Sequence, residues 1–219
     1  MTDIPYEPGL RYRSGRDALT DSEIALVLRA CTTAKDYALI GLTIATGMRR
    51  EDVVNVEQAH IREIPPEETG ANGFVIGIVY WEHKRRRMWR AYVAGQIAQF
   101  CVQFMNSHPK SRWLFPSPFS EKRHISSRHA YDLFQRALKK AGLRPRPFHA
   151  LRATCIKQCQ RRGWTIEQTM ELTGDSWRTI QEHYLTPSED ELRETAISKP
   201  LVGTPLMKLV AQAAKEKSM

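Results

Sequence analysis

The stretch that decides the fold covers residues 146–184. It begins RPFHALRATC and ends WTIEQTMELTGDSWRTIQEHY, with Tyr184 as its last residue. His149 and Arg152 stand three residues apart at the expected start of a helix, so both side chains lie on one helix face. The N-terminus of that helix adds partial positive charge and free amides. This face therefore predicts a site for a phosphate.

Two further basic residues stand upstream of this stretch. Arg49 lies in ATGMRRED at 45–52, where Gly47 is expected to close one helix and Arg49 to open a short one. Lys84 lies in the basic run EHKRRRMWR at 82–90. Two arginines, a lysine, a histidine and a late tyrosine are the groups that cleavage of a phosphodiester by a tyrosine needs.

The matching pieces are TGMRRED at 46–52, LFP at 114–116, PFHALRAT at 147–154 and LTGD through Tyr184. In these pieces and their order the chain resembles the catalytic domain of the tyrosine recombinases, the phage integrase family, over about residues 18–190. The resemblance implies a site-specific DNA recombinase that acts through a covalent 3′-phosphotyrosine. It also implies double-stranded DNA as partner and a homotetramer assembled on that DNA.

The composition fits a basic globular protein. The 219 residues carry a net charge of +9 and are 42% hydrophobic, with five tryptophans. Arginines cluster at 85–87, 144–152 and 161–162, which favours a polyanionic partner, although such clusters also occur as plain solvated surface. No apolar run is long enough to cross a bilayer, so we expect no membrane association.

The cysteines indicate a reducing compartment. Cys31, Cys101, Cys155 and Cys159 form no CxxC pair, and the N-terminus does not read as a signal peptide. We therefore expect a cytoplasmic, nucleoid-associated protein of prokaryotic, viral or plasmid origin. Cys155 and Cys159 share a helix face, but further metal ligands are missing nearby, so packed thiols are expected there.

The chain divides into a flexible basic arm (1–18), a catalytic domain (19–187) and a helical tail (188–219). The domain is expected to be mixed α/β, mostly helical with a small three-stranded antiparallel sheet. A T-x-x-E capping box predicts a helix start at Thr20, and 34–46 is apolar almost all round, which indicates a central helix. The expected strands are 56–64, 74–81 and 88–94. The later helices are expected near 96–107, 127–141, 149–162, 165–173 and 176–185. Residues 112–124 are expected to form a loop that packs on the core.

The tail predicts a helix capped by Ser188 and a last amphipathic helix within PLMKLVAQAAKEK at 205–217. That last helix either closes its own core or, as the resemblance implies, docks on a neighbouring subunit.

Arginine is the expected phosphate clamp, because its planar, permanently charged fork matches two phosphate oxygens. Arg49 and Arg152 take this role, Tyr184 is the nucleophile, and His149 is its base or hydrogen-bond partner. The resemblance implies Lys84 as the acid that protonates the leaving 5′ oxygen. A phosphotyrosyl bond conserves the energy of the broken link, so no cofactor is expected. The residues expected to contact the DNA backbone are Arg50, Arg85, Arg86, Arg87, Arg144 and Arg146.

The chain departs from the family pattern at two points. Asp175 stands nine residues before Tyr184, where the family usually has histidine or tryptophan. An ionised carboxylate repels a phosphate, so Asp175 is expected to lower the rate while it caps the last helix or pairs with Arg178 or a catalytic arginine. The family's N-terminal DNA-binding domain is also not recognisable ahead of Leu19, so weak, salt-sensitive DNA binding is expected. A type IB topoisomerase and a DNA-binding accessory protein with a decayed site remain alternatives.

Overall fold

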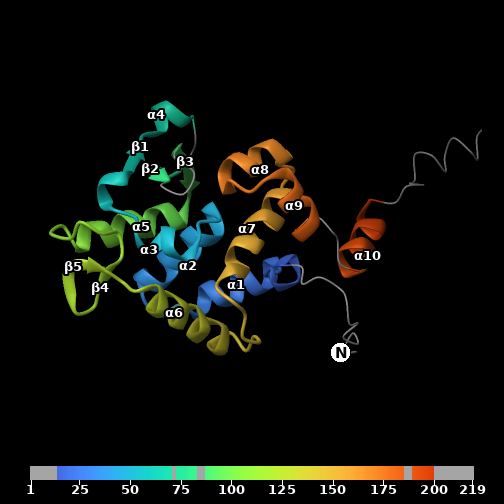
Figure 1. Ribbon diagram of the computed structural model, residues 1–219, viewed down its shortest axis with the longest axis horizontal. Helices are drawn as coiled ribbons and strands as arrows, with labels where there is room; N and C mark the ends of the chain where they lie inside the picture. Colours follow the sequence, from blue (N-terminus) through green and yellow to red (C-terminus); the bar gives the residue numbers. More distant parts are fainter. Residues whose placement is uncertain (1–13, 71–72, 83–86, 185–188, 200–219) are drawn as a thin grey trace, which may run out of the picture. The chain divides into compact units, whose positions relative to one another are not determined.

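The computed structural model describes residues 14–70, 73–82, 87–184 and 189–199 (Figure 1). The chain forms two compact units, residues 1–185 and 186–219. The second unit contains α10, Glu189–Ser198. Ser188 and the helix expected at 205–217 lie outside the described residues.

The first unit is mostly helical with a small antiparallel sheet, as the sequence predicts. Its elements, in chain order, are η1 Ser14–Asp17, α1 Asp21–Ala30, α2 Ala34–Thr46, α3 Arg50–Val54, η2 Gln58–His60, β1 Ile61–Ile64, α4 Pro66–Thr69, β2 Val75–Glu82, β3 Arg87–Ala94, α5 Gln96–Ser107, β4 Pro116–Ser117, β5 Ser120–His124, α6 Ser127–Lys140, α7 His149–Arg161, α8 Ile166–Thr173 and α9 Trp177–His183.

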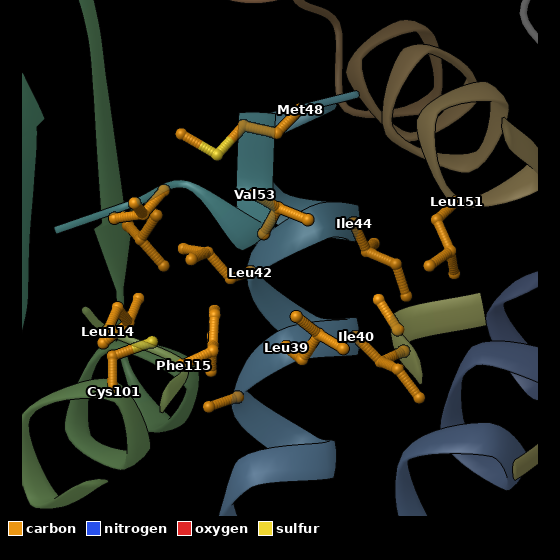
Figure 2. Close-up of a cluster of buried hydrophobic side chains, with 14 of the residues drawn as sticks. Leu39, Ile40, Leu42, Ile44, Met48, Val53, Cys101, Leu114, Phe115 and Leu151 are labelled. Carbon is orange, nitrogen blue, oxygen red and sulfur yellow. The ribbon is translucent and has the colours of Figure 1, made fainter. Parts of the chain in front are cut away.

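Helix α2 is the centre of the core. It contacts α5, α6, α7 and β3, and its residues 38–44 are all buried. In Figure 2, Phe115 and Cys101 lie on one side of α2 and Leu151 of α7 on the other. The side chain of Thr33 caps the start of α2, and Gly47 ends it in the left-handed conformation with φ 65°. The end of α2 thus places the segment that begins at Met48 beside the N-terminal half of α7.

Helix α1 begins with the expected capping box between Thr20 and Glu23. Glu23 also binds the guanidinium of Arg146, with Oε1 2.6 Å from Nη2 and Oε2 3.0 Å from Nη1. Burial by itself raises the pKa of Glu23, but hydrogen bonds from Arg146 and Thr20 outweigh it and lower the pKa below its usual value. This pair ties α1 to the segment that leads into α7.

The sheet has the order β1-β2-β3, with both pairs antiparallel. In β3, Trp89 is buried, and its indole Nε1 donates to the carbonyl oxygen of Leu172 at 2.7 Å. This hydrogen bond holds the last turn of α8 against the sheet. Strands β2 and β3 pair from Val75 and Ala94 up to Glu82 and Arg87, and the tip between them, residues 83–86, lies outside the described residues.

The structure differs from the expected elements in three places. The expected loop 112–124 contains the two-stranded sheet β4-β5, whose strands are too short, and too close to prolines, to leave a recognisable period. The strand expected over 56–64 covers only 61–64, because η2 occupies its first half. Residues 14–17, assigned above to the flexible arm, form η1 and pack against α7, with Asp17 buried and paired to Arg144. Residues 1–13 lie outside the described residues.

The cysteines are free thiols, and three of the four are buried. Hydrogen bonding to Cys159 and burial raise the pKa of Cys155, and burial raises that of Cys101 to about 12. Within the described residues no group of three or more histidine, cysteine, aspartate or glutamate side chains is arranged to hold a metal ion. The same part of the chain contains no helix with the length and apolar character needed to cross a membrane.

Candidate active site

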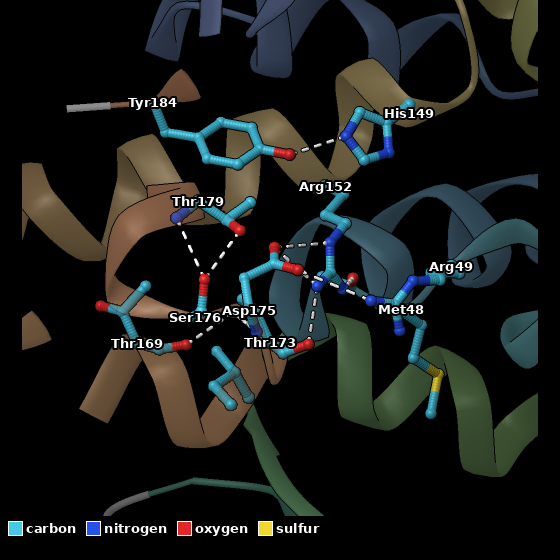
Figure 3. Close-up of polar contacts among 12 residues, drawn as sticks. Met48, Arg49, His149, Arg152, Thr169, Thr173, Asp175, Ser176, Thr179 and Tyr184 are labelled. Carbon is cyan, nitrogen blue, oxygen red and sulfur yellow. Dashed lines mark hydrogen bonds and ion pairs between the residues drawn. The ribbon is translucent and has the colours of Figure 1, made fainter. Parts of the chain in front are cut away.

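His149 and Tyr184 are brought together by α7 and α9. His149 is the first residue of α7, and Tyr184 follows the last residue of α9. The phenol oxygen of Tyr184 lies 2.7 Å from Nε2 of His149, which is hydrogen-bonding distance (Figure 3). Ile180, one turn earlier on α9, packs with Tyr184 against Ala153 and Ile156 of α7. This apolar contact fixes how α9 lies on α7 and thereby aims the phenol at the imidazole.

Arg152 lies one turn after His149 and is 3% exposed. Its Nη1 donates to the carbonyl oxygen of Gly47, and its Nη2 donates to that of Thr173 at 2.7 Å. Gly47 and Thr173 lie at the C-terminal ends of α2 and α8, where the last carbonyl oxygens of a helix have no partners within the helix. A buried arginine between two helix ends satisfies those oxygens and two of its own N–H donors, so the position of its guanidinium is tightly fixed.

Asp175 joins the two arginines of the expected clamp. Its Oδ2 lies 2.7 Å from Nη2 of Arg152 and accepts from Nε at 3.1 Å. Its Oδ1 lies 3.5 Å from Nη2 of Arg49, the N-cap residue of α3. Of the expected partners, Asp175 therefore takes Arg49 and Arg152, because Ser176 caps α9 and Arg178 pairs with Glu182.

A pocket opens beside these groups. Its volume is about 410 Å³, and Arg49, His149 and Arg152 line it together with Tyr131 and residues 147–148 and 50–51. The N-terminus of α7 offers fewer amides to this pocket than expected, because the amides of Ala150 and Leu151 donate to the carbonyls of Pro147 and Phe148. The positive charge of the pocket therefore comes mainly from side chains.

The residues expected to contact the DNA backbone have different surroundings. Arg50 is partly exposed, at 43%, and lies 3.5 Å from Glu51. Arg144 pairs with Asp17 at 2.9 Å, and Arg146 is 8% exposed and bound to Glu23. Lys84, Arg85 and Arg86 lie outside the described residues, and only the backbone of Arg87 is described, as the start of β3. The roles of these residues in DNA contact stay a prediction.

Sequence reasoning missed the two backbone carbonyls that hold Arg152. Gly47 was expected only as a helix terminator, yet its oxygen is a partner of the guanidinium. A Cβ at Gly47 would lie 3.2 Å from Sγ of Cys155, so the close approach of α2 to α7 favours glycine in addition to its φ of 65°. A glycine followed two residues later by arginine was the visible signal, but it did not indicate which arginine the carbonyl binds.

The fold is that of tyrosine recombinase catalytic domains. The XerA recombinase matches with a TM-score of 0.66 and 16% identity, over 84% of this chain and 65% of that chain. The XerH recombinase, in a post-cleavage complex with a palindromic difH substrate, matches with a TM-score of 0.66 and 17% identity, over 82% of this chain and 52% of that one. The catalytic core of lambda integrase matches with a TM-score of 0.54 and 18% identity, over 76% and 97%.

The model of the phage integrase family matches residues 17–191. The chain therefore belongs to the phage integrase family. It spans about half to two thirds of the length of the Xer recombinases that it matches. No curated protein matches its sequence at a significant level.

Proposed function

We propose that this protein is a site-specific DNA recombinase that cleaves and rejoins DNA strands through Tyr184. The observation that carries the proposal is the 2.7 Å contact between the phenol of Tyr184 and His149, one helical turn from the buried Arg152. A tyrosine and an imidazole in contact beside two guanidinium groups match the needs of phosphoryl transfer to a phenol. Membership of the phage integrase family supports the same chemistry.

In the proposed reaction the phenol oxygen of Tyr184 attacks phosphorus, and its proton passes to Nε2 of His149. The new bond joins phosphorus to the tyrosine, and the bond to the 5′ oxygen breaks. Arg49 and Arg152 neutralise the charge that gathers on the non-bridging oxygens, which is usually the largest contribution to such catalysis. The phosphotyrosyl bond keeps the energy of the phosphodiester, so religation needs no cofactor.

The leaving 5′ oxygen requires a proton, and we propose Lys84 as its source. The lysine lies between β2 and β3, in the segment 83–86. Trp89, on β3, binds the end of α8, and Thr173 of α8 binds Arg152. Strand β3, which follows Lys84 in the chain, is thus connected to the clamp by two hydrogen bonds.

We propose double-stranded DNA as the substrate and a tetramer as the active assembly. The net charge of +9 supports a polyanionic partner. Among the similar structures are a lambda integrase dimer bound to a COC′ core site and a lambda integrase tetramer bound to a Holliday junction. Docking of the tail, residues 188–219, on a neighbouring protomer is part of the same proposal.

The test is capture of the covalent intermediate. DNA that copurifies with the chain is sequenced, and a nicked duplex of that sequence is prepared so that the cleaved end diffuses away and religation stops. Wild type is expected to give an adduct that survives SDS and whose mass equals that of the protein plus the strand segment on the 5′ side of the cleaved bond, which is joined to Tyr184 through its 3′ phosphate. Tyr184→Phe removes only the nucleophilic oxygen and is expected to give no adduct.

Binding of DNA without an adduct by wild type would refute the proposal and favour the decayed accessory protein. If the adduct forms, two labelled duplexes separate the remaining functions. Joint molecules are expected from a recombinase, whereas a topoisomerase only relaxes supercoils.

A further inference from the structure

Each of the three nitrogens of the Arg152 guanidinium has a partner within the protein itself. The guanidinium has five N–H donors. Within the described part of the chain, Nε donates to Asp175, Nη1 to Gly47 and Nη2 to Thr173, and Nη2 also lies 2.7 Å from Oδ2 of Asp175. The hydrogen bonds use three donors, and Asp175 faces the Nε–Nη2 edge, which is one of the edges an arginine presents to an anion in a bidentate pair. A phosphate that is to be gripped by this edge finds a carboxylate in place.

The carboxylate of Asp175 spans both arginines in the way expected of a phosphodiester. One oxygen faces Arg152 at 2.7 Å and the other faces Arg49 at 3.5 Å. A phosphodiester likewise has one negative charge and two non-bridging oxygens. In Figure 3 dashed lines join the carboxylate of Asp175 to the guanidinium groups of both Arg152 and Arg49, below the pair formed by His149 and Tyr184.

We propose that the carboxylate of Asp175 occupies the position on Arg49 and Arg152 that the scissile phosphate takes, and that it has to leave this position when the phosphate binds. The inference rests on the proposed function in naming that phosphate. The adjoining pocket is lined by Arg49, His149 and Arg152 and gives an incoming anion access to both arginines. Without phosphate, both arginines are therefore bound by the carboxylate of Asp175, and the affinity for phosphate is set by competition with this carboxylate.

The position of Asp175 in the chain connects this exchange to the nucleophile. Gly174, with φ 68°, ends α8, and Ser176 caps α9. Asp175 thus lies in the short turn between the two helices, and α9 leads directly to Tyr184. Movement of the carboxylate out of the clamp changes the start of the helix that aims the phenol.

A purely positioning role for Asp175 predicts the opposite result. If the carboxylate only holds Arg49 and Arg152 in place, removal of its charge loosens the clamp and weakens phosphate binding. If it competes with phosphate, removal of its charge strengthens binding. The sign of the change in affinity therefore decides between the two roles.

The probe is inorganic phosphate, titrated into the full 219-residue chain and followed by isothermal calorimetry and by the melting temperature. Asp175→Asn keeps the size and a hydrogen-bond acceptor but removes the charge. It is expected to bind phosphate at least about tenfold more tightly than wild type, since like unit charges a few Å apart near a surface repel by more than that factor. Glu182→Gln removes a carboxylate from α9 that pairs with Arg178 outside the clamp, and it is expected to leave the affinity unchanged.

Equal or weaker phosphate binding by folded Asp175→Asn would overturn the proposal. If this variant does not fold, Asp175→His replaces the acid with the residue type usual for the family, and the same tighter binding is required of it. Adding Arg49→Gln to either variant must abolish the gain in phosphate affinity, because it removes one of the two guanidinium groups that bind the phosphate. None of these titrations needs strand cleavage, so their failure is distinct from a missing covalent adduct.

Discussion

The buried Arg152 should contribute more to folding than any exposed arginine pair of this protein. Replacing it with methionine leaves the carbonyls of Gly47 and Thr173 without their partner, and each unsatisfied buried group costs about 1–3 kcal/mol. It also leaves the carboxylate of Asp175, 10% exposed, with Arg49 at 3.5 Å as its remaining partner within the clamp. Breaking a buried ion pair typically costs about 3–5 kcal/mol in total. We expect the free energy of unfolding to fall by that amount.

Urea unfolding followed by tryptophan fluorescence measures this change. With a slope of about 2 kcal/mol per M, the midpoint should fall by about 2 M. Arg178→Met is the matched control, because Arg178 is 81% exposed and its pair with Glu182 lies on the surface of α9. We expect its midpoint to equal that of wild type.

A second measurement separates the ion pair from the carbonyls. Adding Asp175→Asn to Arg152→Met removes the charge left behind, so part of the lost stability should return. A loss below about 1 kcal/mol for Arg152→Met would show that the two carbonyls and Asp175 find other partners, and the reasoning from buried contacts would fail.

Three further predictions concern other contacts. Tyr184→Phe should abolish adduct formation while lowering the free energy of unfolding by only about 1 kcal/mol, because it removes one hydrogen bond with His149; a loss of fold seen by circular dichroism would contradict this. Trp89→Phe should cost about 1–3 kcal/mol in urea unfolding and slow strand cleavage, because the end of α8 loses its donor; unchanged values for both would contradict the connection to the clamp. The pKa of Glu23 is lowered in the folded state, so the stability from its pair with Arg146 is fully present above the unfolded-state pKa and is lost as pH falls through the folded-state pKa. Glu23→Gln should therefore make the melting temperature fall less steeply as the solution is acidified. An unchanged acid side of the melting-temperature profile would argue against this.

Local signals predicted most of the elements from the sequence. The capping box at Thr20, the apolar run of α2 and its closing Gly47 depend on residues within a few positions of one another, so they are readable without the fold. The order and spacing of the motifs were enough to identify the family, which the match over residues 17–191 confirms. The strands β4 and β5 escaped this reading because two to five residues carry no usable period.

The partners of the charged residues were decided by tertiary structure alone. From the sequence, Arg146 was a candidate for DNA contact, yet the fold buries it against Glu23, 123 residues away. Asp175 had three expected roles, as a helix cap or as the partner of Arg178 or of a clamp arginine, and the packing of α2, α7 and α8 selected Arg152 and Arg49. The sequence gives the charge of each side chain. Its ion-pair partner depends on how helices that are distant in the chain pack against each other, because ion pairs form only within a few Å. The sequence thus determined the family and the candidate chemistry of this protein, and the packing determined that its two arginines already hold an anion of their own.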